Sequence, residues 1–214
     1  MDKRTDGLRR VKALSDWLDG RRPTLMGAAG EYAVLVPLVE RQDGLYLLYE
    51  VRSRTMRRQP GEVCFPGGRV EPGELPEACA LRETEEELSI PPSAITILGK
   101  LDFIAHRANF LMHPVLALVE ESAIEHMTLN PGEVDETFLV PLSHLLSTPP
   151  MEHSYRLLPE LGDGFPYELL GITRDYRWQT GQESVPIYPW GEHVIWGLTG
   201  RITRHLVALL GKLE

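Results

Sequence analysis

Four acidic side chains stand close together beside an arginine in residues 82–87, which read Arg-Glu-Thr-Glu-Glu-Glu. Glu86 and Glu87 follow Glu83 by three and four positions. On a helix, which advances about 100° per residue, these three carboxylates share one face. Because like charges at these spacings repel, a cation bound between them would stabilise the helix. Oxygen ligands without histidine or cysteine suit Mg²⁺ or Mn²⁺ better than Zn²⁺.

An acidic run on a helix is often only a solvated face, and the neighbouring residues decide between the two interpretations. Ala80, Leu81, Thr84 and Leu88 form a separate stripe, which would anchor the helix to a core and leave the acids on another face. Residues 65–68 read Phe-Pro-Gly-Gly, which predicts a strand end that breaks into a tight turn. The acidic helix is therefore expected to follow directly on a glycine-rich loop.

The spacing from this loop into the helix resembles the Nudix box. Gly68, Glu74 and Arg82 are separated by six and eight residues, and the glutamates follow Arg82 directly. Membership of the Nudix hydrolase family implies an α/β fold, an α/β/α sandwich around a mixed β-sheet. It also implies metal-dependent hydrolysis of a diphosphate that is linked to another moiety. A structural protein with an acidic helix would need the glycines, Glu74 and Arg82 to coincide by chance.

Two positions depart from the Nudix pattern. Thr84 stands where a bulky aliphatic residue is usual, and Ser89 stands where glycine is usual. We expect the Thr84 hydroxyl to bond the carbonyl one turn back. Ser89 would have to end the helix in the left-handed conformation that glycine adopts more easily. Neither departure removes a carboxylate, so the expected chemistry is unaffected.

The resemblance implies roles for individual residues. The metal ligands would be Glu83, Glu86, Glu87 and the carbonyl of Gly68. The catalytic group would be Glu86, Glu83, Arg82 and Glu133. Arg82 would orient the glutamates, and Glu74 would hold Arg82 or the loop. The general base of Nudix enzymes lies either inside the box or on a distant loop. Glu133, in an acidic turn, is the candidate outside the box, although a solvated turn explains its charge equally well.

The segment upstream of the box is similar to that of coenzyme A diphosphatases, most of all the peroxisomal type. Residues 51–53 read Val-Arg-Ser, and residues 60–68 read Pro-Gly-Glu-Val-Cys-Phe-Pro-Gly-Gly. One arginine of that signature falls on Ser53 here, between two neighbouring arginines. Guanidinium groups bind phosphate oxygens in pairs, which suits the diphosphate and 3′-phosphate of coenzyme A. The substrate-binding residues would be Arg52, Arg54, Arg57, Arg58 and Phe65.

This similarity predicts the products 4′-phosphopantetheine and adenosine 3′,5′-bisphosphate. Two alternatives stay open from the residues alone. One is a Nudix hydrolase of ADP-ribose, NADH or a dinucleoside polyphosphate, which would share every box residue. The other is a non-catalytic Nudix module, although such modules usually lack box glutamates that are all present here.

The composition is that of a globular protein without a membrane span or a signal peptide. The chain has 214 residues, a formal net charge of −9 and 43% hydrophobic residues. An acidic chain argues against nonspecific nucleic-acid or membrane-surface binding, so the expected partner is a small molecule. Two cysteines suit a reducing compartment, and we expect a cytoplasmic protein. The sequence does not predict an oligomeric state.

Hydrophobic patterning predicts the elements that hold the site. A hairpin is expected over residues 32–39 and 45–51, followed by a basic loop over residues 52–61. Further strands are expected over residues 62–65, 95–104, 113–120 and 138–140, and helices over residues 142–146 and 193–213. Residues 149–163 are expected to be irregular.

One domain boundary follows, between residues 25 and 26. Residues 1–25 would be a helical extension, and residues 26–214 a single Nudix domain that includes the C-terminal helix. In the extension, an apolar stripe predicts a helix that packs on the domain; the stripe comprises Leu8, Val11, Leu14, Trp17 and Leu18.

Overall fold

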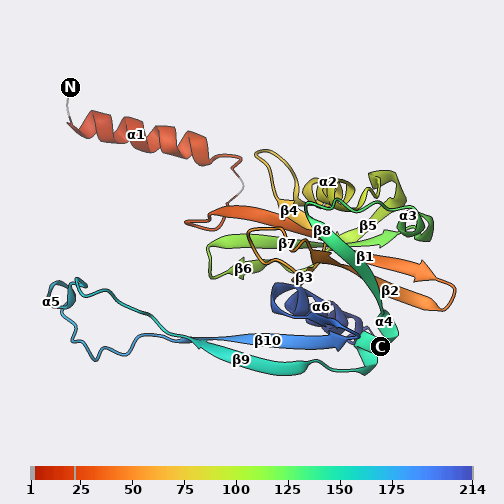
Figure 1. Ribbon diagram of the computed structural model, residues 1–214. Helices are drawn as coiled ribbons and strands as arrows, with labels where there is room; N and C mark the ends of the chain where they lie inside the picture. Colours follow the sequence, from red (N-terminus) through yellow and green to blue (C-terminus); the bar gives the residue numbers. More distant parts are fainter. Residues whose placement is uncertain (1–2, 22, 214) are drawn as a thin grey trace.

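The computed structural model describes residues 3–21 and 23–213, which form two β-sheets and several helices (Figure 1). The larger sheet has eight strands and the smaller has three. The strands of the larger sheet are β1 (Gly30–Arg41), β2 (Gly44–Arg52), β3 (Val63–Cys64), β4 (Gly67–Arg69), β5 (Ile95–Lys100), β6 (Ile104–His106), β7 (Phe110–Val119) and β8 (Val134–Pro141). The smaller sheet comprises β9 (Met151–Leu157), β10 (Gly181–Trp190) and β11 (His193–Ile195). The helices are α1 (Lys3–Leu18), α2 (Pro76–Leu88), α3 (Glu121–Glu125), α4 (Leu142–Ser147), α5 (Tyr167–Leu170) and α6 (Gly197–Leu210), with a 3-10 turn over Pro92–Ala94.

The larger sheet is mixed, as the sequence predicts. Strands β1 and β2 form the expected antiparallel hairpin, with Leu38 opposite Leu47. Strand β1 pairs with β7 in parallel, from Gly30 opposite Phe110 to Val39 opposite Val119. The main path through the sheet is β3-β2-β1-β7-β5. Strand β1 therefore lies at the centre of this path, between β2 and β7.

Alternating side chains of the central strand feed two separate cores. Val34, Val36 and Leu38 point to one face, while Leu35 and Val39 point to the other. The first face is covered by α4 and α6, and the second by α2 and α3. Because both faces are buried, β1 is apolar without interruption over residues 33–39. This arrangement is the predicted α/β/α sandwich around a mixed sheet.

Helix α6 lies between the two sheets (Figure 1). On one side, the Tyr49 and Thr203 hydroxyls form a buried hydrogen bond of 2.9 Å that joins β2 to α6. On the other side, Arg204 donates to both carboxylate oxygens of Glu152 on β9, at 3.0 and 2.9 Å. The smaller sheet is therefore held to the domain through α6.

Three predictions about the N-terminal helix and the C-terminal third of the chain are wrong. The apolar stripe of α1 does not pack on the domain, because Leu8, Val11 and Trp17 are each more than 60% exposed. Residues 149–163 are not irregular throughout, because Met151–Leu157 pair with β10 as strand β9. The expected helix over residues 193–213 begins as strand β11, and the helix itself starts at Gly197. Single-sequence periodicity cannot reveal the long-range packing and pairing that decide these cases.

Among the described residues, none of the helices combines the length and the apolarity that crossing a membrane requires.

Candidate active site

Helix α2 presents the acidic residues, and its geometry explains why the two unusual positions are tolerated. It starts with Pro76 in the first turn and buries Ala80, Thr84 and Leu88 against the sheet. The Thr84 hydroxyl donates to the Ala80 carbonyl at 2.7 Å, which confirms the predicted bond one turn back. Ser89 ends the helix at φ 57°, in the predicted left-handed conformation.

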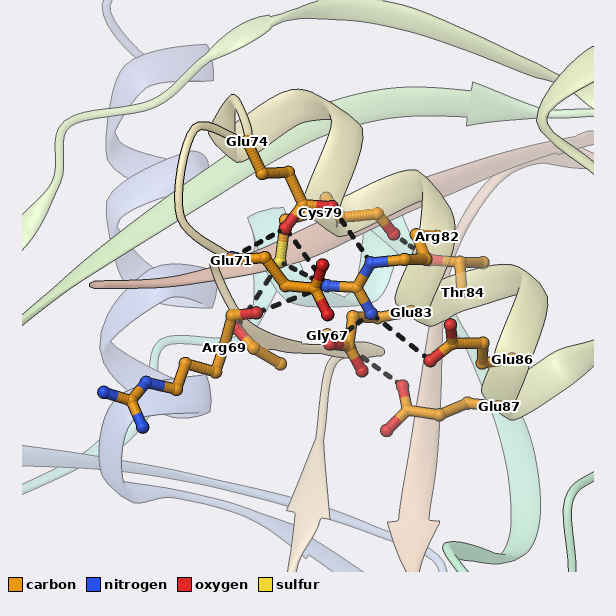
Figure 2. A network of polar contacts seen from close by, with 12 residues as sticks. Gly67, Arg69, Glu71, Glu74, Cys79, Arg82, Glu83, Thr84, Glu86 and Glu87 are labelled. Carbon is orange, nitrogen blue, oxygen red and sulfur yellow. Dashed lines mark hydrogen bonds and ion pairs between the residues drawn. The ribbon is translucent and has the colours of Figure 1, made fainter. Parts of the chain in front are cut away.

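Arg82 is the centre of a carboxylate network (Figure 2). Its Nε and Nη2 donate to the two oxygens of Glu74 at 2.9 and 3.1 Å, a bidentate pair. Its Nη1 donates to Glu83 at 2.8 Å and to Glu86 at 3.3 Å. The Glu71 backbone N–H also donates to Glu74 at 2.9 Å, which ties this network to the loop before α2. Arg82 thus fixes the direction of two glutamates from a neighbouring position.

The glycine loop approaches the acidic helix so closely that a side chain would not fit. A Cβ added to Gly68 would lie 2.3 Å from the Glu83 carboxyl carbon. Gly67 has φ 154°, and its Cβ would lie 2.3 Å from the Ala33 carbonyl oxygen of β1. The Gly67 N–H donates to Glu87 at 2.8 Å. The two glycines therefore bring backbone atoms directly against the carboxylates.

Glu50, Glu83 and Glu87 crowd one region beside Glu133, and burial and like charges raise the pKa of these three carboxyl groups. Burial, followed by the charge of Glu50, raises the pKa of Glu87, although the Gly67 N–H opposes this shift. Burial also raises the pKa of Glu50, with smaller contributions from Glu133 and Glu83. The pKa of Glu83 is raised by burial against the opposing effect of Arg82. Full ionisation of these carboxylates would therefore leave more buried negative charge than their own hydrogen bonds balance.

Glu50 is the member of this cluster that sequence reasoning missed. It is 1% exposed on β2, where its Oε1 accepts a hydrogen bond from the Cys64 thiol at 3.1 Å. Within the described residues, Oε2 of Glu50 has no hydrogen-bond partner. The signal was a glutamate inside the otherwise apolar strand Leu-Tyr-Leu-Leu-Tyr-Glu-Val at residues 45–51.

The donor set fits a divalent cation. Glu83 and Glu87 offer carboxylate oxygens, and Glu50 adds a buried oxygen without a partner. In residues 3–21 and 23–213 no group of three or more acidic, histidine or cysteine side chains already converges to hold a metal ion. The reason is visible in Figure 2, where Glu83 and Glu86 turn toward Arg82 and Glu87 turns toward Gly67. A cation would therefore bind carboxylates that each already accept a hydrogen bond at one oxygen.

A cavity of about 750 Å³ opens beside the acidic helix. Of the predicted site residues, its lining includes Arg52, Arg58, Phe65, Gly68, Glu83, Glu87 and Glu133. Glu86 is half exposed and does not line the cavity. Arg82 does not line it either, but it contacts the cavity-lining Glu83. Arg54 is exposed and pairs with Asp135 at 3.7 Å, and Arg57 is also exposed outside the lining. The fold thus brings part of the arginine segment to the carboxylates and directs the rest to solvent.

Arg52 is placed at the cavity by an irregularity of the sheet. The pairing of β2 with β8 shifts register between Val51 and Arg52, as a β-bulge does. Within the described residues, the buried Nε of Arg52 has no hydrogen-bond acceptor. An unpaired buried donor is costly, and a ligand oxygen would supply the missing acceptor.

Several lining residues come from segments for which the sequence offered little signal. They are His106, Arg107, Tyr155, Glu183, Trp196 and Arg201. Three other aromatic residues of the same region, Phe165, Tyr176 and Trp178, do not line the cavity. They contact one another near α5, at the far end of the β9–β10 hairpin.

The NUDIX domain family model matches residues 31–161, which is more than half of the chain. The chain therefore belongs to the Nudix family. Nudix hydrolases generally require divalent metal ions, in keeping with the donor set of α2.

Within the family the chain is similar to coenzyme A diphosphatases. It is 33% identical to the human mitochondrial coenzyme A diphosphatase over 195 residues, covering 90% of this chain and 75% of that protein. It is 37% identical to the mouse peroxisomal coenzyme A diphosphatase over 120 residues, 56% of this chain, and the match spans only 50% of that protein's length. An uncharacterized Nudix hydrolase of Photorhabdus laumondii is 35% identical, with 81% of each chain covered. A solved Ap4A hydrolase of Caenorhabditis elegans has a TM-score of 0.46 and 23% identity, covering 54% of this chain and 83% of that one.

Proposed function

We propose that this protein hydrolyses the diphosphate bond of coenzyme A and its derivatives, using Mg²⁺ or Mn²⁺. The observation that carries the proposal is one cavity that holds the Nudix carboxylates together with Arg52 and Arg58 of the upstream segment. The names of the human and mouse relatives support the same substrate class. The products would be 4′-phosphopantetheine and adenosine 3′,5′-bisphosphate.

The metal would be held by Glu83, Glu86 and Glu87 with the Gly68 carbonyl, and Glu50 could complete the set from β2. When bound, the cation supplies charge neutralisation for the diphosphate and lowers the pKa of a bound water. Arg82 keeps Glu83 and Glu86 directed through hydrogen bonds of 2.8 and 3.3 Å. Removing this orientation should lower the rate without removing a ligand.

Glu133 would act as the general base. It lines the cavity from the turn just before β8, where Asn130 Nδ2 donates to its Oε2 at 3.1 Å. The oxygen of water would form a bond to one phosphorus while the P–O–P bridge breaks, and the water proton would pass to Glu133. The unpaired Nε of Arg52 would donate to a diphosphate oxygen. Arg58 would add positive charge in the cavity lining. The exposed Arg54 and Arg57 would add positive charge on the surface nearby.

The test is a panel of substrates with product identification by mass. Coenzyme A, ADP-ribose, NADH and a dinucleoside polyphosphate would be compared with Mg²⁺ or Mn²⁺ and with a chelator. We expect coenzyme A to have the highest kcat/KM. A higher kcat/KM on another compound of the panel would identify that nucleoside diphosphate derivative, and not coenzyme A, as the substrate.

Variants of α2 test the metal site. Glu86→Gln and Glu87→Gln should each lower kcat by about a hundredfold or more, because each removes a charged ligand. Glu85→Gln is the matched control, since Glu85 is exposed on the same helix. Near wild-type rates in both of the first two variants would show that this helix does not bind the metal.

The predictions of a cytoplasmic location and of no nucleic-acid or membrane partner stay predictions, and fractionation of cells with an antibody against the protein tests the first.

A further inference from the structure

The cavity is lined by more than the carboxylates, and one part of its wall, here called the hairpin end, is built by other parts of the chain. Arg107 lies in the turn between β6 and β7, Tyr155 and Glu183 lie on the β9–β10 hairpin, and Arg201 lies on α6. Figure 1 shows that the hairpin and α6 lie on the side of the larger sheet away from α2. A diphosphate occupies only a small part of about 750 Å³, so this end is available to another part of a substrate.

Two guanidinium groups converge on a single carboxylate there. Arg201 Nη1 donates to Glu183 Oε1 at 2.6 Å, and Arg107 Nη1 contacts Glu183 Oε2 and the Tyr155 hydroxyl. The Tyr155 hydroxyl donates to Glu183 Oε2 at 2.7 Å. Glu183 and Tyr155 are direct cross-strand neighbours in the hairpin. The hairpin therefore holds two arginines from two different segments at one point of the cavity.

This cluster carries a surplus of positive charge. Two guanidinium groups face one carboxylate, and each guanidinium has five N–H donors of which Glu183 accepts only a few. Burial lowers the pKa of the neighbouring His106. The charges of Arg107 and Arg201 lower this pKa further, whereas the charge of Glu183 raises it. At neutral pH the nearest histidine therefore adds little charge, and the surplus comes from the two arginines.

We propose that Arg107 and Arg201, positioned by Glu183, bind a phosphate monoester of the substrate that lies remote from the scissile diphosphate. This inference rests on the proposed function, in which that group is the 3′-phosphate of coenzyme A. A phosphate oxygen pair matches the planar fork of a guanidinium, and two forks at one point bind a dianion better than one. The site thereby distinguishes a phosphorylated ribose from an unphosphorylated one.

The cluster is not needed merely to hold the hairpin on the domain. Arg204, one turn further along α6, already bridges to Glu152 of β9 outside the cavity lining. The backbones of α6 and β10 also meet directly, because a Cβ on Gly200 would lie 2.6 Å from the Pro186 carbonyl oxygen. Arg204→Gln is therefore the matched control, since it removes a bond between α6 and the hairpin without touching the cavity.

The experiment compares coenzyme A with 3′-dephospho-coenzyme A as substrates of wild type, Arg107→Gln, Arg201→Gln and Arg204→Gln. We expect the first two variants to lose about tenfold or more in kcat/KM on coenzyme A, mainly through KM, as for a lost charge-assisted hydrogen bond. Their kcat/KM on the dephosphorylated substrate should stay near that of wild type. Arg204→Gln should leave the ratio between the two substrates unchanged. Urea midpoints of all four proteins check that each variant folds.

A binding measurement separates this inference from the proposed function. Calorimetry with a chelator present would compare adenosine 3′,5′-bisphosphate with adenosine 5′-monophosphate. Arg107→Gln and Arg201→Gln should weaken binding of the bisphosphate and leave the monophosphate unaffected. Equal losses on both ligands, or on both substrates, would overturn the assignment and leave the proposed function standing. If wild type cleaves neither substrate, the proposed function fails, and the calorimetric comparison still decides this inference.

Discussion

Replacing Glu87 by glutamine should stabilise the metal-free protein, and the gain should grow with pH. Glu87 is only 5% exposed and stands near Glu50, so that burial and a like charge both raise its pKa above the ordinary value of 4.5. Glutamine has the same shape, and its side-chain oxygen can still accept the Gly67 N–H. The substitution therefore removes the ionisation and keeps the packing.

The sign follows from the difference in proton affinity between the two states. As pH rises past about 4.5, the unfolded chain releases the Glu87 proton first, whereas the folded protein retains it up to a higher pH. Wild type therefore loses stability relative to Glu87→Gln, by at most about 1.4 kcal/mol for each pH unit between the two pKa values. Below the unfolded pKa the difference is constant, because both states hold the proton.

The assay is urea unfolding of both proteins in a chelator, at about pH 5 and about pH 8, with Glu85→Gln as the exposed control. Mg²⁺ should then reverse the order. A ligand at a hundred times its dissociation constant adds about 2.7 kcal/mol, and wild type should gain far more of this than the variant. A stability difference that does not change with pH, or equal stabilisation by Mg²⁺, would refute the assignment of Glu87 as a buried metal ligand.

Three further substitutions test the glycine loop, the buried face of α2 and its C-terminal cap. Gly68→Ala should lower kcat by about a hundredfold, because its Cβ would displace the Glu83 carboxylate, and retained activity would show that Glu83 can move without loss. Thr84→Val should change the free energy of unfolding by less than about 1 kcal/mol in a urea titration, since the hydroxyl only adds a second bond to the Ala80 carbonyl. Ser89→Gly should raise that free energy by about 1 kcal/mol, because glycine adopts φ 57° without strain, and an unchanged urea midpoint would contradict this reasoning.

The elements that the sequence predicted well are those whose evidence is local. The hairpin of β1 and β2 shows as two apolar runs around a polar turn. Helix α2 shows as a periodic stripe beside an acidic face, and the bonds of Thr84 and Ser89 follow from their own positions in that helix. Each of these inferences uses residues within one or two helical turns of each other, where covalent geometry limits the possible arrangements.

The predictions that failed depend on partners far away in the chain. The stripe of α1 has the periodicity of a packing helix, but periodicity does not say whether the domain offers a complementary surface. Strand β9 exists because β10 pairs with it, with Tyr155 opposite Glu183. The exposure of Arg54 and the burial of the Arg52 Nε also depend on β8, which lies about eighty residues later.

The sequence alone determined the family and the acidic helix that follows the glycine loop, because the Nudix box is a contiguous pattern of residues. Only the tertiary structure decided which charges share the cavity. It added Glu50 to the carboxylates, directed Arg54 and Arg57 to solvent, and brought Arg107 and Arg201 together at Glu183. The physical reason is that electrostatic and phosphate-binding interactions act over a few ångströms in space, whatever the separation of the residues along the chain.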